Sequence, residues 1–96
     1  MCGGFTNVNV ADEHIQQVAD SVKASVESRL NTTLSTYKAI SYKSQIVAGT
    51  NYKIKVQVGD DKYVHIKVFV GLPCNGGESE LTDFKADCSV DSEIDF

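Results

Sequence analysis

The chain has few of the residues on which metal sites and covalent cross-links depend. Of its 96 residues, three are cysteine, two are histidine, one is proline and none is tryptophan. Cys2, Cys74 and Cys88 form an odd set without a Cys-x-x-Cys spacing, which favours neither a disulfide framework nor a zinc site. With the histidines equally scattered, we expect no metal and no cofactor.

Long apolar and basic segments are also missing. No stretch approaches the roughly 18 apolar residues of a membrane span, and residues 1–10 lack the basic and apolar parts of a secretory signal. Because the chain begins with its own Met1, we expect it to remain in the reducing cytoplasm, away from membranes. A net charge of −4 and a pI near 4.9 argue against electrostatic binding of nucleic acid.

The short length leaves little room for an enclosed catalytic cavity. A chain of 96 residues is expected to form a single domain over 1–96, with one small core. His14 and His65 fall on different predicted elements, and Asp60-Asp61 falls in a predicted turn, where aspartate is common. These patterns indicate that the protein is not an enzyme.

The spacing of apolar residues predicts one helix followed by a run of strands. Between Asp12 and Leu30 the apolar residues recur every three or four positions and form one stripe, with Asn9 or Asp12 as the N-cap. From Tyr37 onward the period changes to two, which predicts strands at 37–44, 50–58, 63–70 and about 81–86. We therefore expect an α+β domain, with one long helix packed on a single antiparallel sheet.

Two connections between these strands are unusually apolar. Gln45-Ile46-Val47-Ala48-Gly49 could simply continue the strand as core, but residues 37–58 would then form one strand about 70 Å long. A turn is therefore expected here, at Gly49. Gly71-Leu72-Pro73-Cys74 is the second apolar connection. The strand order predicts that both lie at one end of the sheet, where adjacent apolar loops suggest a protein partner.

These segments are similar to the conserved segments of the cystatin family. Gln45-Ile46-Val47-Ala48-Gly49 resembles the Gln-x-Val-x-Gly signature, and the leader Met1-Cys2-Gly3-Gly4 and the Leu72-Pro73 pair stand in the same order as in cystatins. The size, the lack of paired cysteines and the lack of a signal peptide resemble the intracellular stefin branch. This resemblance implies a fold of about five antiparallel strands wrapped around one helix.

The resemblance also implies a function, which is reversible, tight inhibition of papain-like cysteine proteases of the cathepsin type. The protease-binding residues it implies are Gly3, Gly4, Gln45, Ile46, Val47, Ala48, Gly49, Leu72 and Pro73. Two alternatives stay open, namely a scaffold protein that uses the same loops on another partner and a strand-exchanged oligomer. We expect a monomer, with a strand-exchanged or Cys2-linked dimer as the other state.

Overall fold

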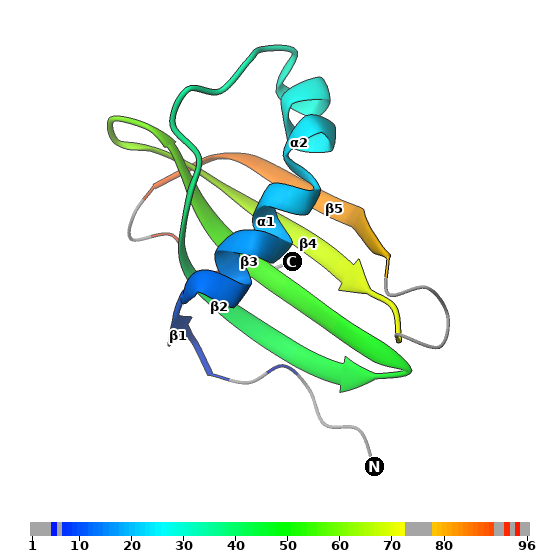
Figure 1. Ribbon diagram of the computed structural model, residues 1–96. Coiled ribbons are helices and arrows are strands. Elements are labelled where there is room, and N and C mark those ends of the chain that lie inside the picture. The colour runs from blue at the N-terminus through cyan, green and yellow to red at the C-terminus, as the bar shows by residue number, and fades with distance from the viewer. Residues whose placement is uncertain (1–4, 6, 73–77, 90–91, 93, 95–96) are drawn as a thin grey trace.

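The fold is a five-stranded antiparallel sheet with two short helices lying across one face (Figure 1). The computed structural model describes residues 5, 7–72, 78–89, 92 and 94. The elements follow the order β1 (Asn9–Val10), α1 (Glu13–Ser21), α2 (Lys23–Leu30), β2 (Lys38–Val47), β3 (Gly49–Gly59), β4 (Lys62–Val70) and β5 (Ser79–Cys88). The predicted α+β class and single antiparallel sheet are confirmed.

Strands neighbouring in sequence are neighbours in the sheet, which has the order β1-β2-β3-β4-β5. All four predicted strands are longer than the alternation predicts, most clearly β2, which continues to Val47, and β5, which spans Ser79–Cys88. The two-residue strand β1 was not predicted. Its Asn9 and Val10 pair with Tyr42 and Ser41 of β2, a contact too short to leave an alternating pattern in the sequence.

The predicted single helix is interrupted at Val22, so the expectation of one long helix is corrected to two consecutive helices. The Ser21 hydroxyl donates to the Val18 carbonyl at 2.6 Å, and the Val22 N–H donates to Ala19 at 3.2 Å. The serine thus takes the carbonyl that the Val22 N–H would use in a regular helix. Helical bonding resumes when Val26 N–H donates to Val22 at 3.0 Å.

Asp12 begins the first helix as its N-cap. Its carboxylate accepts a hydrogen bond from the Ile15 N–H at 3.0 Å, which confirms one of the two predicted capping residues. Asn9 instead donates its side-chain amide to the Asn7 carbonyl. The second helix ends at Asn31, whose φ of 57° is the left-handed conformation usual at a helix end.

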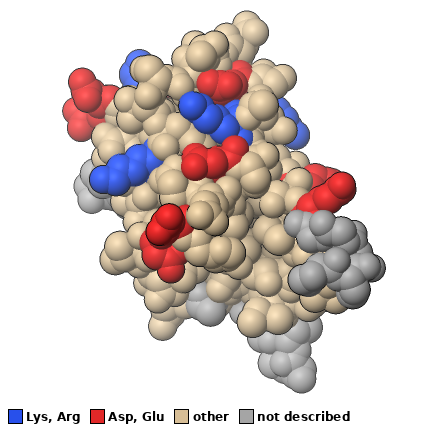
Figure 2. Space-filling model, viewed as in Figure 1, with Lys and Arg blue, Asp and Glu red and all other residues tan. Residues whose placement is uncertain are grey.

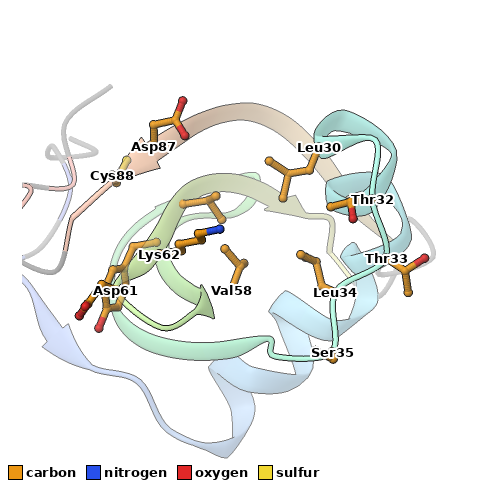
Figure 3. Close-up of a pocket in the computed structure, with 12 residues that line it drawn as sticks. Leu30, Thr32, Thr33, Leu34, Ser35, Val58, Asp61, Lys62, Asp87 and Cys88 are labelled. Atoms are coloured by element: carbon orange, nitrogen blue, oxygen red, sulfur yellow. The ribbon is translucent and has the colours of Figure 1, made fainter.

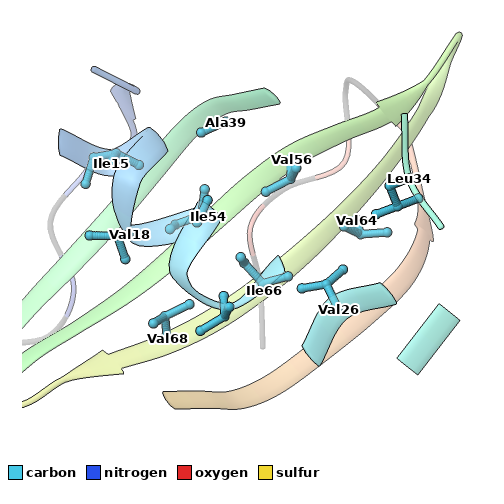
Figure 4. Packing of buried hydrophobic residues seen from close by; sticks show 12 residues of the cluster. Ile15, Val18, Val26, Leu34, Ala39, Ile54, Val56, Val64, Ile66 and Val68 are labelled. Carbon is cyan, nitrogen blue, oxygen red and sulfur yellow. The ribbon is translucent and has the colours of Figure 1, made fainter. Parts of the chain in front are cut away.

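The core lies between the helices and the facing side of the central strands (Figure 4). Alternate residues of β3 and β4 point toward the helices and are fully or almost fully buried. The core consists of Ile15, Val18, Ala19, Val22, Val26, Leu34, Ala39, Ile54, Val56, Val64, Ile66 and Val68. Burial of this apolar stripe against one sheet face is the main stabilising contribution.

Acidic and basic side chains are interspersed on the face shown in Figure 2, which includes the helices. Within the part of the chain that the structure describes, no helix is long and apolar enough to cross a membrane. Of the three cysteines in the sequence, Cys88 is a buried free thiol. Cys2 and Cys74 lie outside the described residues.

Candidate functional site

The two apolar connections lie at the same end of the sheet, as the strand order predicts. The β2–β3 hairpin and the end of β4 point the same way in Figure 1, and the β3–β4 turn lies at the opposite end. Ala48 is the single residue between β2 and β3, and Val47 pairs directly with Gly49. The prediction of a tight turn at this position is confirmed.

The hairpin end exposes apolar side chains to solvent. Ile46 is 76% exposed and Val47 is 38% exposed, and Ala48 is also exposed. Apolar side chains normally lie inside, so a row of them at a strand end marks a surface suited to contact with another protein.

Gly49 allows this hairpin to approach β4 closely. Its φ is 122°, a conformation that other residues rarely adopt. A Cβ atom at this position would lie 2.6 Å from the Val70 carbonyl oxygen and 2.7 Å from Cζ of Phe69. The glycine therefore fixes both the turn and its contact with the next strand.

A side-chain hydrogen bond braces the same hairpin. Asn51 on β3 pairs with Gln45 on β2, and the Asn51 amide donates to the Gln45 Oε1 at 3.2 Å. Our sequence reasoning did not identify Asn51. Its place six residues after Gln45, across a turn centred on Ala48, is the signal that could have identified it.

Leu72 provides the second exposed apolar region at this end of the sheet, after the hairpin. Its side chain is 38% exposed, and the base of its loop is closed where the Gly71 N–H donates to the Glu78 carbonyl at 3.0 Å. A hollow of about 460 Å³ lined by Ala48, Phe69, Gly71, Glu78, Ser79 and Glu80 adjoins both loops. The structure therefore brings Ala48 close to the base of the Leu72 loop. Pro73 lies outside the described residues.

The leader meets the sheet near this end. Gly3 and Gly4 lie outside the described residues, but the next residue, Phe5, has its ring 4.1 Å from the Lys53 ammonium nitrogen. Val8 and Val10 are two further exposed apolar side chains that the sequence analysis did not single out. We call the described surface formed by Gln45–Gly49 and Leu72 the apolar edge.

The two histidines, which are the residues most suited to acid–base chemistry, are both engaged in contacts within the fold. His14 lies on α1, where its Nε2 is 3.3 Å from the Tyr52 hydroxyl, whereas His65 is buried within β4. Within the described ranges, no group of three or more histidine, cysteine, aspartate or glutamate side chains could hold a metal ion. What the described residues of the apolar edge offer to a partner is shape and apolar surface.

A larger hollow of about 560 Å³ lies at the other end of the sheet (Figure 3). Leu30, Leu34 and Val58 line it, together with the buried Cys88. The Cys88 thiol donates to the Lys85 carbonyl at 3.5 Å, and none of the described lining residues is a histidine that could act as its base. This hollow therefore has no paired catalytic groups among the described residues.

The chain is similar to known proteins over nearly its full length. Residues 3–91 match the family model described as the cystatin domain. The chain is 45% identical to Cystatin-A of Felis catus, covering 96% of this chain and 94% of the relative. It is 40% identical to Cystatin-B of Macaca fuscata fuscata, covering 100% of this chain and 98% of the relative.

Another relative carries a functional name. Leukocyte cysteine proteinase inhibitor 1 of Sus scrofa is 43% identical, covering 98% of this chain and 91% of the relative. Membership of this group agrees with the expectation of an inhibitor rather than an enzyme. With Cystatin-A and Cystatin-B, the stefins, among its relatives over nearly the full length, the chain belongs to the cystatin family.

Proposed function

We propose that the protein is a reversible, tight-binding inhibitor of papain-like cysteine proteases of the cathepsin type. The observation that carries this proposal is the apolar edge, in which a braced hairpin and an exposed leucine lie at one end of a rigid sheet. Family membership and the inhibitor name of one relative support the same activity.

The edge would block the protease by filling its cleft. The Gln45–Gly49 hairpin would lie over the catalytic cysteine and histidine of the protease, and Leu72-Pro73 would occupy the primed side. The leader at Gly3 and Gly4 would occupy the unprimed subsites. Because the hairpin would cover the nucleophile without offering it a peptide carbonyl in position for attack, the inhibitor would remain uncut.

The construction of the edge explains how a small surface could bind tightly. Cross-strand pairing from Gln45 to Asn51 and the close approach of Gly49 to Val70 fix the hairpin before it meets a partner. A preformed loop loses little conformational entropy on binding. Burial of its apolar side chains then contributes about 25 cal/mol per Å², less the entropy of association.

The variant Ala48→Glu tests whether the hairpin enters the protease cleft. An unpaired carboxylate buried in the contact is expected to weaken binding by about 3 kcal/mol, or roughly a hundredfold in the inhibition constant for papain. The matched control is Ala24→Glu, which adds the same charge at an exposed position on α2. Equal inhibition constants for the two variants would show that the hairpin does not dock as proposed.

A further inference from the structure

Little apolar burial attaches the first strand to the rest of the sheet. The strand β1 lies beside β2 at the edge of the sheet (Figure 1), where Asn9 pairs with Tyr42 and Val10 pairs with Ser41. Both residues of β1 are exposed, and Val10 is 85% exposed. Because burial of apolar surface is the main stabilising term, a two-residue strand with exposed side chains holds the leader only weakly by itself.

The direction of β1 carries the leader toward the apolar edge. β1 is antiparallel to β2, and β2 runs toward the hairpin that begins at Val47. The residues that precede β1 therefore follow β2 toward the same end of the sheet. The Asn9 side-chain amide donates to the Asn7 carbonyl at 3.0 Å and braces this stretch.

A second contact joins the leader to the middle of the sheet. The ammonium nitrogen of Lys53 lies over the Phe5 ring, 4.1 Å from the ring centroid, which is well within the range of a cation–π interaction. Both side chains are half-buried, and partial removal from water strengthens this interaction. Since the next residue, Ile54, points into the core, Lys53 belongs to the sheet face opposite the helices.

The register explains why an aromatic ring suits this position. Lys53 pairs with Lys43 on one side and with Lys67 on the other, so three lysines stand in one row across β2, β3 and β4. Like charges directly opposite each other raise the local positive potential. The face of an aromatic ring is electron-rich and attracts cations, so Phe5 is better matched to this row than an aliphatic side chain would be.

We propose that Lys53 is a positioning residue for protease binding, which acts by holding Phe5 and with it the leader beside the apolar edge. This inference rests on the proposed inhibition of cysteine proteases. Gly3 and Gly4 directly precede Phe5, so the chain allows them a reach of only about 7 Å from a fixed Phe5. A leader that is already held near its binding position loses less conformational entropy when the protease binds.

Proton NMR of the free protein tests the contact without any protease. The ε-methylene protons of Lys53 should resonate upfield of those of Lys62, which is exposed in the β3–β4 turn, because they lie over an aromatic ring. The variant Phe5→Leu should remove this upfield shift. Equal Lys53 shifts in the unaltered protein and in Phe5→Leu would overturn the proposal.

Inhibition of papain then tests the positioning role. Lys53→Met should raise the inhibition constant about two- to fivefold, the range expected for loss of a cation–π contact. Lys53→Arg should restore it, since a guanidinium group also stacks on aromatic rings. The matched control Lys67→Met removes the same charge from a half-buried position in the same row and should leave the inhibition constant unchanged.

A double-mutant cycle assigns the effect to the pair. The loss caused by Lys53→Met should disappear in a Phe5→Leu background, because the ammonium group then has no ring to hold. The same loss in both backgrounds, or tighter inhibition by Lys53→Met, would overturn the positioning role. An unaltered protein that showed the upfield shift but did not inhibit papain would refute the proposed function, and with it the role in binding, while the contact itself would stand.

Discussion

At the scale of single residues, Gly49 links the conformation of the hairpin to the shape of the apolar edge. Replacing it by alanine would place a methyl group 2.6 Å from the Val70 carbonyl oxygen at a φ of 122°. The strained backbone alone should lower the free energy of unfolding by roughly 1–3 kcal/mol. Urea unfolding of Gly49→Ala would measure this loss, and inhibition of papain by the folded variant should also weaken.

Gly59 provides the matched control, since it lies at the other end of β3 and a Cβ there would come no closer than 3.4 Å to the Lys62 side chain. Gly59→Ala should therefore leave inhibition unchanged. If Gly49→Ala kept both full stability and full inhibition, the close approach of the hairpin to β4 would be shown to contribute to neither.

At the scale of elements, the first helix depends on its N-cap. Asp12→Ala removes the carboxylate that accepts from the Ile15 N–H, and should lower the free energy of unfolding by about 0.5–2 kcal/mol. Asp12→Asn keeps a good capping side chain and should lower it far less. Chemical denaturation of both variants checks the prediction, and equal losses would point to the charge rather than to the cap.

The elements could be predicted well from the sequence where one periodicity dominates. The stripe of Ile15, Val18 and Val22 indicated a helix, and alternation from Tyr52 to Val58 indicated a strand. The interruption at Val22 could not be predicted in this way, because it depends on which carbonyl the Ser21 hydroxyl selects.

The candidate functional site could also be predicted only where a local sequence pattern marks it. Apolar residues in a turn are visible in the sequence, so the Gln45–Gly49 hairpin could be anticipated. The bond from Asn51 to Gln45 depends on the strand register, and the burial of His65 depends on packing between elements. A single sequence does not specify these long-range contacts.

At the scale of the whole molecule, the stability should depend on pH through His65. Its pKa is lowered to about 4 in the folded protein, first by burial and then by Lys55 and Lys85, whereas an unfolded histidine titrates near 6.5. Between these values the unfolded chain binds more protons than the folded one. The free energy of unfolding should therefore fall as the pH is lowered from about 6.5 to about 4.

Urea unfolding at several pH values in this window would measure that dependence. Carboxylates also titrate toward its lower end, so the comparison with His65→Gln isolates the histidine. The variant should show a shallower slope than the unaltered protein, and parallel slopes would contradict a buried neutral His65.

The two main surface features of the molecule, the apolar edge and the larger hollow, lie at opposite ends of the sheet. The apolar edge lies at one end, and the hollow lined by Leu30, Leu34 and Val58 lies at the other, beside the β3–β4 turn. A chain of this size has room for one small core, and under the proposed inhibition it would act by filling the cleft of another protein with its end rather than by enclosing a substrate. This distribution is the physical basis of the proposed inhibition.

Titration of active papain with the intact protein tests the central claim most directly. Residual activity against a small peptide substrate should fall linearly with added protein and reach zero near one inhibitor per active site. The released inhibitor should be uncut by mass spectrometry. Papain that kept full activity in a micromolar excess of the protein would contradict the account.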